Sequence, residues 1–375
     1  MLRRFFTARL LPALLPLVVG LPPAAQAHDH IPHVATDIAP VHALVAQVMQ
    51  GVGTPDLILP PGASPHGYSM RPSEAAALAD ADLVVWVGPT LTPWLEKSLD
   101  TIAAGAARLT LTENGVTAQL PFREAAVFGD EDHHGAHDDD HDGDHDAEHN
   151  SDHDDHDTHE THDDHDNAQH EDHDKDHADD HDADHADHDA EHSDGHDHDH
   201  DHAAGAMDPH VWLDPVNAQM WLGVIADQLA ERDPEHADVY LANAKSARAG
   251  LDALIADTRQ TLTPLADTRF VVFHDAYQYF EARFGLKAAG AISLGDASRP
   301  SPARIAALRD AVKDGQITCA LAEPQFNAGL INTVFEGTDV STQVIDPLGA
   351  ALTPGPALYT QLLRGMADSF VGCVK

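Results

Sequence analysis

The chain is poor in basic residues: 21 Lys and Arg stand against 63 Asp and Glu, for a formal net charge of −42 over 375 residues. A protein this acidic repels phosphate groups, which excludes a nucleic-acid binder that works through a basic face. The acidity is concentrated, however, because residues 130–202 hold 33 acids, one Lys and 22 His and carry −32 of the charge. The remaining sequence is ordinary in charge and long enough for about two domains.

Long apolar runs are also missing. Beyond the N-terminus, no segment reaches the roughly 18 uninterrupted apolar residues of a membrane-spanning helix. The N-terminus combines Arg3 and Arg4, an apolar run from Leu10 to Leu21, and the small-x-small triplet that ends at Ala27. This pattern predicts a cleaved secretory signal over residues 1–27, in preference to a membrane anchor, for which the run is short. We expect a soluble mature chain that starts at His28 and carries no membrane segment.

Cysteine is scarce as well, with Cys319 and Cys373 as the only two. In an exported protein an even pair indicates one disulfide bond. Two buried free thiols remain an alternative. A zinc site of two Cys and two His is disfavoured, because the two Cys are far apart and neither has a C-x-x-C partner.

What the sequence does contain, outside residues 130–202, is an alternation of short apolar segments and helical patterns in both halves of the chain. This order predicts an α/β fold of two lobes, each a parallel sheet covered by helices, with a long helix between them. The expected strands are Val34–Asp37, Leu57–Leu59, Leu83–Val87, Phe270–Phe273, Ala288–Ile292, Thr318–Ala322 and Thr342–Ile345. The expected helices are Val41–Gln50, Pro72–Ala79, Pro93–Leu99, Pro215–Arg232, Pro234–Leu262, Ala276–Arg283, Pro302–Lys313, Ala328–Phe335 and Pro356–Phe370.

Residues 130–202 have almost no apolar side chains and cannot bury enough surface to offset the entropy of ordering. We predict a disordered His/Asp-rich insertion in a surface loop. Spacings such as His196-Asp-His198 bring imidazoles close enough to chelate metal weakly in a flexible chain. A purely charge-based role in solubility is the alternative.

Eight histidines lie outside the insertion, and three of them share a context. His66 lies in the loop after a predicted strand, His210 just before a predicted helix, and His274 where a buried strand meets its helix. Ligands are commonly held at such positions, on rigid elements that face a cleft. Asp346 repeats the placement at a later strand end. Three imidazoles and one carboxylate suit Zn²⁺ in tetrahedral geometry.

At this point a family resemblance becomes specific. The segments G-A-S-P-H-G-Y-S-M-R-P-S, D-P-H-V-W-L-D-P, V-V-F-H-D-A-Y, E-P-Q-F and D-P-L-G occur in this order from about Val34 to the C-terminus. They resemble the zinc-binding solute-binding proteins of the ZnuA type, within the cluster A-I metal-binding family. The resemblance implies two lobes joined by a rigid long helix, a metal between the lobes, the ligands His66, His210 and His274, and delivery of zinc to an ABC permease in the inner membrane.

The resemblance also predicts how the chain is divided into domains. It implies a signal at 1–27, an N-terminal lobe at 28–233, a linker helix at 234–263 and a C-terminal lobe at 264–375. It implies a periplasmic, non-enzymatic protein, which we expect to be a monomer, and a disulfide in the last lobe that matches the two Cys. The weak point is the fourth ligand: some zinc members have Glu before the first His, where this chain has Pro65. Asp346 or water then completes the shell.

Three other functions stay open. A manganese or iron carrier of the same family is disfavoured, because such relatives typically have Glu where His274 stands and imidazole suits zinc better. A periplasmic zinc buffer without a transporter is a second alternative. A secreted zinc hydrolase is remote, because the chain has no H-E-x-x-H motif and needs no general base for the binding role.

The other histidines and the neighbours of the ligands receive simpler interpretations. We expect His42 and His236 on helix surfaces, and His28, His30 and His33 in a frayed N-terminal cluster that is able to bind metal. Four residues flank the predicted ligands. The aromatic residues Tyr68 and Trp212 would either shield the site or serve only in packing. The acidic residues Asp214 and Asp275 would either orient the ligand imidazoles or cap helices.

Overall fold

The computed structural model describes residues 30–123, 125, 127–128, 206–293, 300–314, 317–326 and 328–374. These residues belong to one compact unit of the chain. The signal predicted over residues 1–27 and the insertion predicted over residues 130–202 lie outside the described residues.

The first half of the chain forms a four-stranded parallel sheet in the order β2-β1-β3-β4. Its strands are β1 (Val34–Thr36), β2 (Asp56–Leu57), β3 (Leu83–Trp86) and β4 (Ala107–Thr110). The central strands β1 and β3 are buried throughout, as expected for a sheet covered on both faces. Three helices connect the strands: α1 (Ala39–Val48), α2 (Pro72–Ala79) and α3 (Pro93–Thr101).

A second parallel sheet repeats this pattern in the order β6-β5-β7-β8. Its strands are β5 (Arg269–His274), β6 (Lys287–Ser293), β7 (Cys319–Ala322) and β8 (Ser341–Val344). The connecting helices are α6 (Gln278–Phe284), α7 (Pro302–Lys313) and α8 (Ala328–Phe335). In each sheet the second strand lies on one side of the first strand and the third strand lies on the other side, so the strand order reverses there. Ligands bind at such points in open α/β sheets.

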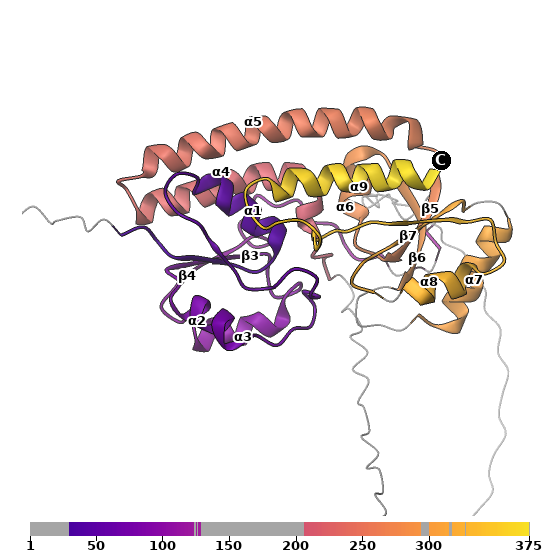
Figure 1. Ribbon diagram of the computed structural model, residues 1–375, viewed down its shortest axis with the longest axis horizontal. Helices are drawn as coiled ribbons and strands as arrows, with labels where there is room; N and C mark the ends of the chain where they lie inside the picture. The colour runs from indigo at the N-terminus through magenta and orange to yellow at the C-terminus, as the bar shows by residue number, and fades with distance from the viewer. Residues whose placement is uncertain are drawn as a thin grey trace, which may run out of the picture. The chain divides into compact units, whose positions relative to one another are not determined.

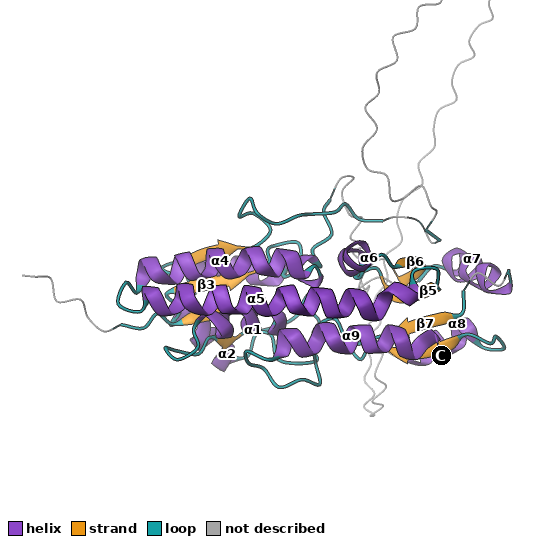
Figure 2. Cartoon of the chain, turned by 90° about the horizontal axis from the view of Figure 1, so that it is seen from above, coloured by secondary structure: helices purple, strands orange, loops and turns teal. Residues whose placement is uncertain are grey.

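Long helices join the two sheets. The chain passes from α4 (Pro215–Arg232) into α5 (Ala237–Leu262), and ends in α9 (Leu358–Val374). Figures 1 and 2 show α4, α5 and α9 running side by side, with α5 packed on α4, α1 and α9. The short 3-10 helices η2 (Val211–Leu213) and η3 (Thr263–Leu265) lead into α4 and out of α5. The long helix expected between the two sheets is therefore present.

The terminal helix α9 belongs to both halves. It packs on β7 and β8, and also on α1 and α5. Cys373 near its end forms a disulfide with Cys319 of β7, with the two Cα atoms 5.5 Å apart. The predicted disulfide is thus confirmed. One contiguous apolar core includes residues from both halves of the chain, from Val34 to Phe370.

The predicted elements agree with the structure to within a few residues, except at the two edges of the first sheet. The strand expected at Leu57–Leu59 is shortened to β2, and β4 was not predicted at all. Strand β4 lies at the edge of its sheet, and among its four residues only Leu109 is buried. An edge strand with one buried side chain lacks the apolar run by which the other strands were recognised.

Candidate metal centre

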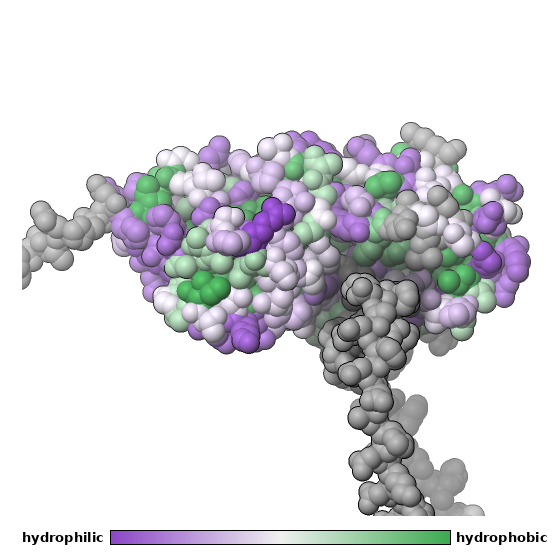
Figure 3. Space-filling model, turned by 60° about the horizontal axis from the view of Figure 1, so that its bottom comes forward, coloured by the Kyte–Doolittle hydropathy of each residue, from purple (hydrophilic) through white to green (hydrophobic). Residues whose placement is uncertain are grey.

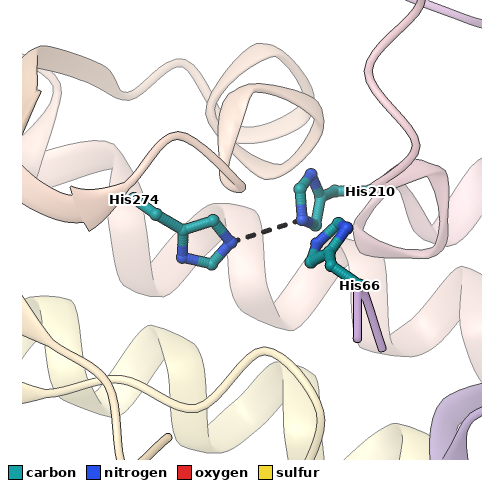
Figure 4. A group of neighbouring side chains, drawn as sticks. All are labelled: His66, His210 and His274. Carbon is teal, nitrogen blue, oxygen red and sulfur yellow. Dashed lines mark hydrogen bonds between the residues drawn. The ribbon is translucent and has the colours of Figure 1, made fainter. Parts of the chain in front are cut away.

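The three predicted histidine ligands converge on one point. His66 lies in the loop between β2 and α2, His210 immediately precedes η2, and His274 is the last residue of β5. Figure 4 shows the three imidazoles facing one another, from three separate segments of the chain. One nitrogen from each ring lies within 4.8 Å of the others, and no other cluster of three or more potential metal ligands occurs among the described residues.

Two of the nitrogens already have the spacing of zinc ligands. His210 Nε2 and His274 Nε2 are 3.3 Å apart. Two nitrogens bound to one tetrahedral zinc ion at about 2.0–2.1 Å lie about 3.3 Å from each other. His66 is the outer member, because its ring centroid lies 5.4 Å and 6.5 Å from those of His210 and His274.

A carboxylate orients each of the two inner imidazoles. His210 Nδ1 lies 2.6 Å from Asp208 Oδ1, and His274 Nδ1 lies 2.6 Å from Glu323 Oε1. All four side chains are nearly inaccessible to solvent. A ring that donates from Nδ1 presents the lone pair of Nε2 to the centre, which is the form that binds metal.

These two carboxylates are the functional residues that sequence interpretation missed. The sequence offers Asp214 and Asp275 either as orienting groups or as helix caps. The carboxylates that bond the imidazoles of the centre are instead Asp208 and Glu323. Asp214 caps α4 by accepting from Val216 N–H and pairs with Arg283, so the capping alternative is correct. The signal for Asp208 and Glu323 was present in the segments D-P-H and E-P-Q-F, but only the fold brings β7 beside β5 and Glu323 to His274.

Asp275 instead forms a buried ion-pair cluster. Arg123, just before the insertion, pairs with Asp275 and with Glu281 of α6. Desolvation alone would lower the pKa of Arg123, but the carboxylates of Glu281 and Asp275 outweigh it and raise that pKa. The cluster fastens the segment before the insertion to the second sheet, where Val127 also pairs with Gly290.

The centre lies in a pocket with mainly apolar walls. Trp212, Phe326, Pro347 and Leu348 line it beside the histidines. The Trp212 ring lies 5.3 Å from that of His210, and the Phe326 ring lies 5.4 Å from that of His274. Such walls limit water around the centre and strengthen electrostatic interactions there.

Other aromatic residues support the His66 loop from behind. Trp94 Nε1 donates to Pro65 O at 2.7 Å, which holds the residue before His66. Tyr68 does not line the pocket: its ring lies edge-on to Trp94 at 5.5 Å, and its hydroxyl donates to Glu74. Of the two aromatic residues that the sequence offers as shields of the site, Trp212 therefore lies at the pocket and Tyr68 packs in the loop.

Asp346, the predicted fourth ligand, is not part of the histidine cluster in this structure. Its Oδ1 accepts from the backbone N–H groups of Leu348 and Gly349, and its Oδ2 accepts from that of Ala350. The carboxylate thus closes the turn after β8. Its role as a metal ligand stays a prediction, and it would require the carboxylate to move toward the three histidines.

The other histidines among the described residues are not grouped with this centre. The prediction that His42 is on a helix surface is wrong, because α1 is covered on nearly all sides and His42 is buried against Pro55 O. Burial lowers the pKa of His42. His236 is partly exposed and bonds Asp233 at the turn into α5. His30 pairs with Asp82, and His28 lies outside the described residues.

None of the described helices combines the length and the apolarity that crossing a bilayer requires.

Comparison with known proteins identifies relatives over nearly the whole chain. The family described as "Zinc-uptake complex component A periplasmic" (ZnuA) matches residues 34–373. The high-affinity zinc uptake system protein ZnuA of Paracoccus denitrificans is 42% identical over 365 residues, which cover 97% of this chain and 98% of the relative. Its namesake from Brucella suis biovar 1 is 42% identical over 342 residues, or 91% of each chain.

Solved structures share the fold. A crystal structure of ZnuA superimposes with a TM-score of 0.64 at 19% identity, covering 92% of this chain and all of the other. A zinc-bound ZnuA with residues 138–173 of its own chain deleted gives a TM-score of 0.62 at 20% identity, covering 92% and 98%. The predicted fold class, two parallel sheets covered by helices, is confirmed.

Proposed function

The chain belongs to the ZnuA family of periplasmic zinc-uptake components, and on that premise we propose that its three-histidine centre captures Zn²⁺ and delivers it to the permease of an ABC transporter. The observation that carries the proposal is the pair of carboxylate-oriented imidazoles, whose Nε2 atoms are 3.3 Å apart. That separation is the one a tetrahedral zinc ion requires.

Charge supports a dication as the cargo. The three imidazoles bind metal in their neutral form, so they leave the ion's charge unchanged. The buried carboxylates of Asp208 and Glu323 bond the Nδ1 atoms of His210 and His274, on the side of each ring away from the centre. Together their two negative charges balance the charge of one Zn²⁺. A neutral water molecule therefore suits the fourth position, and we favour water over Asp346 there because the Asp346 carboxylate is not grouped with the three histidines.

The alternatives fit the centre less well. Manganese and iron favour oxygen-rich sites, whereas this centre offers three imidazole nitrogens. A hydrolase needs a general base beside the open position. The described carboxylate on the pocket wall, Glu323, bonds His274 Nδ1, so it is engaged in orienting that imidazole and not placed as such a base.

The cellular setting follows from the same premise. Residues 1–27 direct export and are removed after Ala27, and the mature chain acts in the periplasm beside the permease. The lobes span residues 28–233 and 264–375, with 234–263 as linker, and the protein is a monomer. Figure 3 shows hydrophobic positions scattered among hydrophilic ones on one face of the described surface, as suits a protein without a large permanent interface.

Ligand substitution tests the proposal directly. In competition with a zinc chelator, His210→Ala and His274→Ala should each raise the zinc Kd by at least about 100-fold, more than the loss of an orienting group usually costs. His236→Ala, at the distant α4–α5 turn, is the matched control and should bind as the parent does. Parent-like affinity in His274→Ala would disprove the centre.

Cobalt distinguishes the cargo classes. Co²⁺ in the parent protein should give the intense visible spectrum of tetrahedral coordination, which is the geometry expected for a zinc centre. A weak octahedral spectrum would support the manganese or iron alternative instead.

A further inference from the structure

One buried amide joins the two inner ligand segments of the zinc centre. Asp208, whose Oδ1 bonds His210 Nδ1, accepts a hydrogen bond on its other oxygen, Oδ2, from Gln278 Nε2 at 2.5 Å. Gln278 is the first residue of α6, which begins four residues after His274 at the end of β5. The turn that carries His274 therefore also carries a group that reaches the carboxylate behind His210.

The partners of the Gln278 amide fix its direction. Nε2 also donates to Pro121 O at 3.0 Å, in the segment that leads to the insertion. An ionised carboxylate and a backbone carbonyl only accept hydrogen bonds, so the amide must turn its NH₂ group toward both of them. The side chains involved are buried, because Gln278 is 8% exposed and Asp208 is 0% exposed. Loss of the bond between them would leave buried polar groups unpaired, which is costly.

Donors on both oxygens hold the Asp208 carboxylate in one orientation. Its Oδ1 accepts from the backbone N–H of His210 at 2.9 Å and from the ring Nδ1 at 2.6 Å, while Oδ2 accepts from Gln278. A rotation of the carboxylate moves both oxygens, so it breaks the Gln278 bond together with the ring bond. The amide thus helps to keep the proton of His210 on Nδ1 and the lone pair on Nε2, which faces the ion.

Gln278 is also uncharged, which matters beside a site for a cation. A basic side chain in its place would offset the charge of Asp208, as Arg123 does for Asp275 in the buried ion-pair cluster. A neutral amide orients the carboxylate and leaves its negative charge to strengthen the imidazole as a ligand.

We propose that Gln278 is a positioning residue of the zinc centre, which fixes the Asp208 carboxylate and, through it, the tautomer and direction of His210. Because Gln278 belongs to α6, it also ties His210 to the segment of His274. The two inner imidazoles then form one preformed pair. The inference deepens the zinc-binding function proposed above and rests on it.

A double-mutant cycle tests whether Gln278 acts through Asp208. Gln278→Met keeps the length of the side chain and removes the amide, and Gln278→Leu serves in its place where the first variant does not fold. The zinc Kd should rise by about tenfold in chelator competition, at the low end of the effect of losing an orienting group. In an Asp208→Ala background the same substitution should not raise Kd further, because the carboxylate through which it acts is gone.

The chain offers a matched control on its surface. Gln219 Nε2 likewise bridges a backbone carbonyl, Arg248 O, and a carboxylate, that of Asp252, through solvent-exposed bonds between α4 and α5. Gln219→Met should bind zinc as the parent does.

Nitrogen NMR of the imidazole rings in the folded, metal-free protein supplies a reading that a merely structural role would not move. The parent should show His210 protonated at Nδ1, and Gln278→Met should show a mixture of the two tautomers. Tyr279→Phe removes a hydroxyl that accepts from Leu120 N–H and donates to Asp208 O, so it loosens the same segment through its backbone alone. This variant should lose stability in urea unfolding and keep the Nδ1 proton of His210.

A parent-like zinc Kd in Gln278→Met, additive effects in the cycle, or an unchanged His210 tautomer would each overturn the positioning role. The zinc centre is judged separately by His274→Ala. If that variant loses affinity while Gln278→Met binds as the parent does, only the positioning role fails. Parent-like binding in both variants would refute the proposed function itself.

Discussion

At the residue scale, the centre is built from pairs. Each inner imidazole, His210 and His274, is backed by one buried carboxylate, Asp208 and Glu323. The pairing fixes which nitrogen faces the metal, so no rotation or tautomer change is needed on binding. His66, on a half-buried loop, has its ring centroid 5.4 Å and 6.5 Å from those of His210 and His274, which are 5.2 Å apart.

Glu323→Gln tests this pairing. The amide keeps an oxygen that accepts from His274 Nδ1 but removes the charge that strengthens the imidazole as a ligand. We expect zinc Kd to rise by about 10–100-fold, the usual effect of losing an orienting group. Chelator competition measures it, with exposed Glu96→Gln as the matched control. An unchanged Kd would mean that Glu323 only packs against the ring.

Asp37 should make stability depend on pH. Burial raises the pKa of Asp37 to about 7, although the N–H groups of Val87 and Ile38 donate to its carboxylate and oppose the rise. The folded protein therefore holds this proton at pH values where the unfolded chain has lost it. The Asp37 contribution to stability is then present near pH 4 and is lost as pH rises toward 7, by up to about 4 kcal/mol.

The measurement is urea unfolding of the parent and Asp37→Asn from pH 4 to pH 8. The unfolding free energy of the parent minus that of Asp37→Asn should fall as pH rises, because only in the parent does unfolding release the Asp37 proton. A difference that is constant across this range would show that Asp37 does not hold its proton.

At the scale of elements, α9 and the disulfide close the molecule. The helix packs on β7 and β8 and extends onto α1 and α5, and Cys373 joins it to β7. The last strand, β8, is a sheet edge with four exposed residues, and it is held by its pairing with β7 and by its packing on α9. The C-terminal helix therefore couples the second sheet to the helices of the first.

Removing the disulfide should destabilise the protein without changing zinc affinity. The bond closes a loop of 54 residues, for which the chain-entropy model gives roughly 4 kcal/mol. The Cys319→Ser/Cys373→Ser double variant should lose up to this amount in urea unfolding, and the reduced parent should behave alike. Alkylation of two thiols in unreduced, oxidatively folded protein would contradict the bond.

At the scale of the whole molecule, the insertion joins the rest of the chain through a short antiparallel stem. Phe122 N–H donates to Ala206 O, and Asp208 N–H donates to Leu120 O. The returning strand leads directly to Asp208 and His210 of the zinc centre, and the outgoing segment is fastened by Arg123. The stem is thus built independently of the acidic residues beyond it.

Deleting residues 130–202 should leave the tight zinc site nearly unchanged, since all three of its histidines lie elsewhere. Zinc stoichiometry should fall from several ions to about one, because the imidazoles of the insertion bind weakly in a flexible chain. Calorimetric titration measures both quantities. Loss of the tight site would mean that the insertion supplies a ligand and that water does not complete the shell.

Much of this protein was determined by local sequence signals. Helices α2 and α7 begin and end at the predicted residues, because proline at the first turn and apolar spacing specify them without tertiary help. The convergence of His66, His210 and His274 was predictable because strand ends and helix starts fix where a side chain faces a cleft. The disulfide followed from an even pair of cysteines in an exported chain.

Tertiary structure decided which distant residues contact one another, because such contacts depend on which strands become neighbours in a sheet. Only the pairing of β5 with β7 brings Glu323 to His274, 49 residues away, whereas Asp208 lies two residues before His210 and reaches it without long-range contacts. The position of His42 also follows from packing, because α1 is covered by α4, α5 and α9 and its residues are almost all buried. Such contacts join residues far apart in the chain, so no local pattern encodes them.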